Sequence, residues 1–174
     1  SNTATSFSYK TPSVGNTMTI TSRANNPAVG DVFASKTGIS PNATNVALTL
    51  PEASALSLPI TAATGITTAT PFNWTAFSGG VHIAFFSGGG RQYHVITQAN
   101  STTIPDFSAE GLGLPAATNF SWQVVGMAPF ASVDAATGPT GPLTDLFKTA
   151  VFSLTPEGDG SYMVSLTRTF TTAP

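Results

Sequence analysis

Apolar and polar residues alternate along most of the chain, which is the pattern of β-strands that bury one face. Residues 17–24 read TMTITSRA and residues 45–51 read NVALTLP, with an apolar residue at alternate positions. The same period predicts further strands at residues 5–11, 30–36, 80–86, 93–98 and 161–170. Glycine-rich stretches at residues 86–92 and 156–162 adjoin these runs and supply the residues that tight hairpins need. The pattern therefore predicts an all-β fold, with antiparallel strands packed as a sandwich.

One segment has helical spacing instead. Residues 141–152 read GPLTDLFKTAVF, with apolar side chains at positions i, i+3, i+4 and i+7 counted from Leu143, which predicts at most a short helix. It belongs to a longer segment, residues 126–152, that is too apolar to lie free in water. We expect this segment to fold back over a sheet edge or a neighbouring domain. The alternative is that it forms a contact surface for a partner.

The two tryptophans of the chain occur in similar phrases, PFNWTAF at residues 71–77 and NFSWQVV at residues 119–125. Each phrase places a Phe and a Trp two residues apart, and therefore on the same face of a strand. Such residues either fill the gap of about 10 Å between two packed sheets or present a flat ring on which a sugar can stack. Trp74 is predicted to be a core residue. For Trp122 both interpretations stay open.

Residues 57–174 resemble a fibronectin type III-like module, an immunoglobulin-like sandwich of bacterial extracellular proteins. Such modules open with a Pro-rich first strand followed by a strand containing Trp, and LSLPITAATGITTATPFNWTAFSGG (residues 56–80) has this order. The family's later pattern of Leu, Thr and Tyr is matched in LPAATNFSWQVV by Leu114, Thr118 and Phe120. Because Phe120 stands where the family has Tyr, the resemblance implies that the hydrogen bond of the tyrosine corner is missing.

The first third of the chain is predicted to be a separate unit. The phrase TGISPNATNVALTLPEA is similar to the exit from a small transthyretin-like sandwich of the carboxypeptidase-regulatory type, which commonly precedes fibronectin-like modules. PEASALSLP (residues 51–59) is the best boundary. We therefore predict a small β domain or extension at residues 1–56 and a fibronectin-like sandwich at residues 57–174. The alternative is that the first strands dock on the second unit.

Composition narrows the range of partners. Only 8% of the 174 residues are charged, the formal net charge is −2, and the six Lys and Arg residues are scattered, which argues against nucleic-acid binding. No apolar run approaches the roughly 18 residues of a membrane helix, so we expect no membrane insertion. The absence of cysteine excludes disulfides and thiolate metal sites. The surface, rich in Ser, Thr and Gly and poor in charge, favours an extracellular or cell-surface location in a bacterium.

Groups that catalysis or metal binding would need are few. His82 and His94 fall on strand faces opposite the apolar ones and are expected to be exposed. Two imidazoles without a third ligand make a poor metal site. Asp106 and Glu110 flank one loop and could be the carboxylate pair of a glycosidase, but nothing singles them out. We predict no catalytic residue, no metal site and no cofactor.

These observations predict a non-enzymatic structural, spacer or adhesion module of a larger bacterial surface or secreted protein. Its expected partners are other domains of the same protein or a surface polysaccharide. The alternative is a carbohydrate-binding module that stacks sugars on exposed aromatic rings. The candidate ligand-contact residues for that alternative are Trp122, Phe130 and Tyr93.

Overall fold

The computed structural model describes residues 16–139, 141, 143 and 158–174. The strand predicted at residues 5–11 and most of the helix predicted at residues 141–152 lie outside this part of the chain. In the part that the structure describes, no helix has the length and apolar character needed to cross a membrane.

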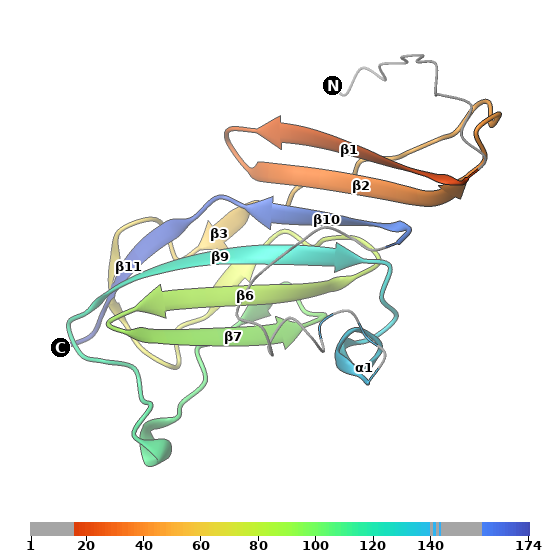
Figure 1. The fold of residues 1–174 in the computed structure, drawn as a ribbon. Helices are drawn as coiled ribbons and strands as arrows, with labels where there is room; N and C mark the ends of the chain where they lie inside the picture. The colour runs from red at the N-terminus through yellow and green to blue at the C-terminus, as the bar shows by residue number, and fades with distance from the viewer. Residues whose placement is uncertain (1–15, 140, 142, 144–157) are drawn as a thin grey trace.

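Of the described residues 47% are in strands and only 6% in helices, which confirms the predicted all-β fold (Figure 1). The helical elements are a short 3-10 turn, η1 (Ser108–Glu110), and one short helix, α1 (Val133–Thr137). The strands are β1 (Met18–Asn26), β2 (Gly30–Ile39), β3 (Leu56–Leu58), β4 (Ala63–Ile66), β5 (Phe72–Trp74), β6 (Val81–Gly88), β7 (Arg91–Thr97), β8 (Ser101–Thr102), β9 (Asn119–Ala128), β10 (Gly160–Ser165) and β11 (Arg168–Thr172). The strand predicted at residues 45–51 is wrong: residues 40–55 contain no strand.

Two sheets form the sandwich. In the described residues the larger sheet has eight strands, and β9 lies at its centre. One side of β9 pairs with β6, which pairs in turn with β7. The other side pairs first with β10 and then with β11. Beyond these two, β2 pairs with β10 and β4 runs parallel to β11. The smaller sheet has the order β3-β5-β8.

A β-bulge divides the last strand, which the alternation predicts as one run over residues 161–170. Val164 pairs with Val125 and Arg168 pairs with Trp122, so four steps along one strand oppose three along the other. The extra residue reverses the alternation. Met163 before the bulge and Phe170 after it therefore both lie in the core, although their numbers have opposite parity.

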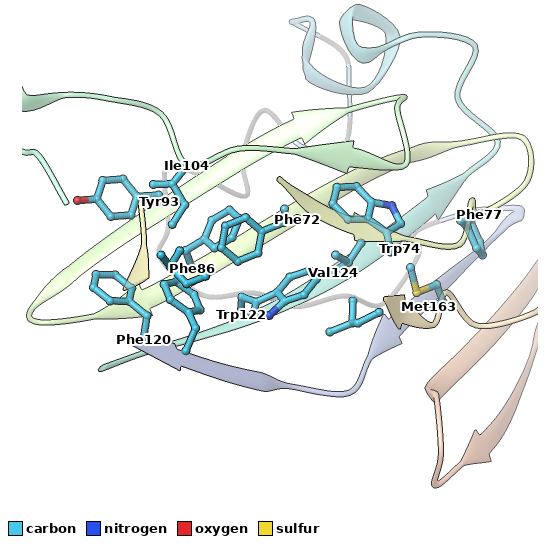
Figure 2. Packing of buried hydrophobic residues seen from close by; sticks show 14 of the residues in the cluster. Phe72, Trp74, Phe77, Phe86, Tyr93, Ile104, Phe120, Trp122, Val124 and Met163 are labelled. Carbon is cyan, nitrogen blue, oxygen red and sulfur yellow. The ribbon is translucent and has the colours of Figure 1, made fainter. Parts of the chain in front are cut away.

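An aromatic cluster fills the space between the sheets (Figure 2). The ring of Phe72, from the smaller sheet, lies 4.8 Å from Phe86, 5.0 Å from Trp122 and 5.2 Å from Phe170, measured between ring centroids. The angles between these ring planes, 60° to 77°, are those of edge-to-face packing. The predicted core role of Trp74 is confirmed, because only 2% of its surface is exposed.

The outer face of the larger sheet carries a second, aliphatic cluster. Val81, Ile83 and Val125 point away from the smaller sheet and pack against Ala136 of α1 and against Leu143, all of them buried. The described part of the segment 126–152 thus folds back on the protein, as expected. It covers a sheet face, however, where we predicted an edge or a second domain.

The N-terminal hairpin β1–β2 is part of the larger sheet. Besides the backbone pairing of β2 with β10, the ring of Phe33 stacks on Tyr162 with 4.2 Å between centroids. The guanidinium of Arg23 lies 5.1 Å from the centre of the Phe33 ring and forms a 2.8 Å ion pair with Asp31. Val32 belongs to the central aromatic cluster. The division of the chain at residue 56 stays a prediction. It now means that residues 1–56 and residues 57–174 would fold independently although strands of both belong to the larger sheet.

Candidate functional site

Two of the three aromatic residues proposed as sugar contacts are core residues. Trp122 is 1% exposed and Tyr93 is 5% exposed, so neither ring has a face that a ligand could reach. The polar neighbours of Trp122 lie on the outer face of the sheet, while its own side chain points to the smaller sheet. The repeated Phe–Trp phrase therefore belongs to the core in both strands. Phe130 is the candidate that stays partly exposed and lines a cleft.

Tyr93 has a structural role instead. Its hydroxyl donates to the carbonyl oxygens of Leu112 at 2.9 Å and Gly113 at 3.1 Å, and its ring stacks on Phe120. Burial raises the pKa of the Tyr93 hydroxyl, which keeps it a donor. This tyrosine fastens the loop before β9 to the sheet. The hydrogen bond that Phe120 cannot make is thus replaced by one from Tyr93 on β7, which β6 separates from β9 in the same sheet.

The cleft that Phe130 lines lies at one end of the sandwich, and we call it the loop-end cleft. Its walls are residues 76–80, between β5 and β6, Gln98, after β7, and residues 129–131, after β9. It is a shallow depression, largely open to solvent, of about 770 Å³. Among the described residues that line it, none carries a charge.

Hydrogen bonds join the walls of the loop-end cleft. The backbone N–H of Phe130 donates to the carbonyl of Gly79 at 3.2 Å. The side-chain amide of Gln98 donates through Nε2 to the carbonyl of Ala131 at 2.9 Å. These bonds connect the loop after β9 to both of the other walls. The cleft is therefore already formed without a ligand.

His82 lies buried beneath the loop-end cleft, so the expectation that it is exposed is wrong. It is 1% exposed, and its Nε2 accepts a hydrogen bond from the backbone N–H of Phe77 at 2.9 Å. Burial lowers the pKa of His82, with a smaller opposing effect from the backbone of Thr97 and Ala99. An imidazole that accepts at Nε2 is neutral and protonated on Nδ1. His82 is thus a neutral support beneath the loop of residues 76–80.

Two glycines allow the strands beneath the cleft to approach closely. A Cβ atom added at Gly80 would lie 2.0 Å from the carbonyl oxygen of Met127. One added at Gly126 would lie 2.7 Å from the ring of Phe77. Any side chain at these positions would push β6 or Phe77 outward. The sequence shows the Ser-Gly-Gly run at residues 78–80, but a turn signal alone does not reveal that the loop faces Phe130.

The other candidate groups serve local structure. His82 pairs with Thr97 and His94 with Phe85, so the two histidines are not cross-strand neighbours. Among the described residues no group of three His, Asp or Glu side chains could hold a metal ion. Asp106 accepts from the backbone N–H of Ser108 at 2.9 Å, and this bond lowers the pKa of its carboxyl group. That carboxylate therefore organises the turn before η1.

A second, smaller hollow of about 240 Å³ lies on the outer face of the larger sheet, between Phe85, His94 and Gln123. The rings of Phe85 and His94 pack edge-to-face, 4.9 Å apart. It lacks the connected loop walls of the loop-end cleft. The loop-end cleft is therefore the better candidate site.

No protein-family model matches the chain, and neither the search of curated proteins nor the search of solved structures found a similar protein.

Proposed function

We propose that the chain is a non-enzymatic structural, spacer or adhesion module of a larger bacterial surface or secreted protein, with a fibronectin type III-like, immunoglobulin-like sandwich at residues 57–174. In this role the protein works outside the cell. It joins or displays other parts of the same protein, or holds a surface polysaccharide.

The order of the strands is the observation that carries this proposal. After the N-terminal hairpin, β3 pairs with β5 in the smaller sheet, while β4 crosses over and pairs in parallel with β11. Then β5 and β8 share the smaller sheet, and β6, β7, β9 and β11 share the larger one. A first strand divided between two sheets, followed by this alternation, corresponds to the connectivity of immunoglobulin-like sandwiches. This order supports the resemblance independently of the sequence phrases.

The same pairing suits a module that carries tension. Because β4 and β11 are parallel, force that reaches the residues just before β4 and just after β11 slides one strand along the other and loads their hydrogen bonds together. Ala62 N–H donates to the Thr169 carbonyl at 2.7 Å, and Ala173 N–H donates to the Ile66 carbonyl at 2.9 Å. The guanidinium of Arg168 adds bonds of 2.9 Å to the carbonyl oxygens of Ser57 and Pro59.

Force spectroscopy on a tandem array of the full chain tests the proposal. We expect one sawtooth peak per copy, with a contour-length gain of about 52–57 nm for residues 16–174 at roughly 3.3–3.6 Å per residue, because the hairpin β1–β2 shares the larger sheet. A chain shortened to end at Thr172 loses the bond from Ala173 and should rupture at lower force. Removal of Pro174 alone is the matched control. Extension of the full chain without a peak would contradict a tension-bearing role.

A further inference from the structure

We propose that the loop-end cleft binds a neutral saccharide, with the ring of Phe130 against one face of a sugar and the polar groups of the cleft bonded to its hydroxyls. This deepens the adhesion role proposed above, in which the module holds a surface polysaccharide, and it rests on that role. The titration below can fail while the force measurement succeeds, so the two proposals are tested separately.

The lining selects against charged ligands. Its described residues are apolar side chains, Ser78, Gln98 and glycine backbone, and none of them is ionised. A carboxylate, phosphate or ammonium group placed there would lose water without gaining a counter-charge, which is costly. A neutral ligand avoids this cost. The formal net charge of the whole chain, −2, gives no long-range attraction for an anion either.

The lining also combines the two kinds of contact that a sugar ring offers. Phe130 and Pro129 provide apolar surface, with Phe77 buried beneath them, and a pyranose has faces made of C–H groups that pack against such surface. Ser78 and Gln98 provide hydrogen-bonding groups for the hydroxyls at the rim of the ring. A purely apolar ligand would remove water from Ser78 and from the part of the Gln98 amide that does not bond to Ala131, without replacing its hydrogen bonds. A polyhydroxylated ring matches both.

The cleft is preorganised for binding. The bond from Gln98 to Ala131 fixes the amide, and the bonds from Phe130 to Gly79 and from Phe77 to His82 fix the two longer walls. Groups that are already ordered lose little conformational entropy when a ligand binds.

Protein NMR on the unmodified full chain is the direct test. The probes are cellobiose, maltose, lactose and N,N′-diacetylchitobiose, each at millimolar concentration, with sialyllactose as the charged comparison. We expect at least one neutral disaccharide to shift the backbone amides of Gly79 and Gly80 and the side-chain amide of Gln98. Absence of these shifts with every neutral probe, or a response to sialyllactose alone, would overturn the proposal.

Variants locate the contact. Phe130→Ala should weaken the binding of the responding sugar about tenfold or more, and Gln98→Ala by about three- to tenfold. Phe107→Ala is the matched control, because Phe107 is 42% exposed beside η1 and does not line the cleft. Phe130→Leu keeps an apolar side chain without a flat face and serves if the alanine variant does not fold. Equal losses in the Phe130 and Phe107 variants would place the contact elsewhere and refute the assignment.

Discussion

The two faces of the larger sheet are buried by different means. On the inner face, aromatic rings from β5, β6, β9 and β11 meet across the gap to the smaller sheet. On the outer face, small aliphatic side chains of β6 and β9 are covered by α1 and Leu143, which follow β9 closely in the chain. The inner face thus depends on contacts between distant segments, and the outer face on a segment that folds back locally. The inner face should therefore contribute more to the stability of the whole sandwich.

Replacing Trp122 by alanine should give the largest effect and break the inner face. Its indole is 1% exposed and packs on Phe72 and Phe86, so we expect the free energy of unfolding to fall by about 3–5 kcal/mol, the usual cost of removing a large buried aromatic side chain. Trp74→Ala should fall in the same range. Urea denaturation measures both, with Leu112→Ala, at a 53% exposed position, as the control. A loss below about 1 kcal/mol would mean that the inner face is not the main core.

Leu143→Ala tests the outer face. The side chain is fully buried against the sheet, and its backbone N–H donates to the Ala136 carbonyl at 3.0 Å. We expect a loss of about 2–3 kcal/mol, near the low end for a buried leucine, because a covering turn relaxes more easily than a strand. The same denaturation series gives the value. A loss as large as that of Trp122→Ala would remove the proposed difference between the faces.

The sequence pattern predicted the inner face better than the outer one for a physical reason. In β5 and β9 the aromatic residues stand on one side and polar residues on the other, so alternation assigns Trp74 and Phe120 correctly. In β6 both faces are buried, and the alternation in the sequence marks Val81, Ile83 and Phe85 as the inner, apolar face. They form the outer one, because Ala84 and Phe86 point to the smaller sheet. Alternation cannot rank two buried faces.

The alternation of apolar and polar residues could not predict the bulge in the last strand or the loop-end cleft, for related reasons. One extra residue before Arg168 changes the side to which every later residue points, and no residue type marks the position. The cleft joins Gln98 to Ala131 and Phe77 to His82, contacts that depend on how three loops meet. The histidine was assigned to the solvent because its neighbours in the strand are apolar. That inference fails where both faces are covered.

Arg168 connects the two sheets at the rim of the inner face, and its replacement tests how much this connection adds to stability. The bulge turns this side chain toward the smaller sheet, where its guanidinium bonds to backbone carbonyls at Ser57 and Pro59. We expect Arg168→Met to lower the free energy of unfolding by about 1–3 kcal/mol, since the carbonyls of Ser57 and Pro59, the second of them partly buried, lose a charged donor. Arg168→Lys, which keeps the charge but cannot bond to several carbonyls at once, should lose an intermediate amount. Equal stability of all three proteins in urea would show that the guanidinium does not join the sheets.

The smallest expected effect is the loss of stability at acid pH that His82, near the start of β6, should cause. Burial lowers the pKa of His82 below its usual 6.5, so the unfolded chain takes up a proton at higher pH than the folded one. The free energy of unfolding should therefore be highest above about pH 6.5 and should fall as the pH drops toward the folded-state pKa, by at most ~1.4 kcal/mol per unit of difference between the two pKa values. A proton on Nε2 would also displace the N–H of Phe77, which opens the wall of the cleft.

His82→Gln keeps an acceptor without a titrating group and should flatten the decline measured by thermal unfolding between pH 7 and pH 5 (roughly the range where histidine titrates). The pKa of His94 is lowered by burial as well, so His94→Gln is the control and should keep the part of the decline that His82 causes. An unchanged pH profile in the His82 variant would separate this histidine from the acid response of the sandwich.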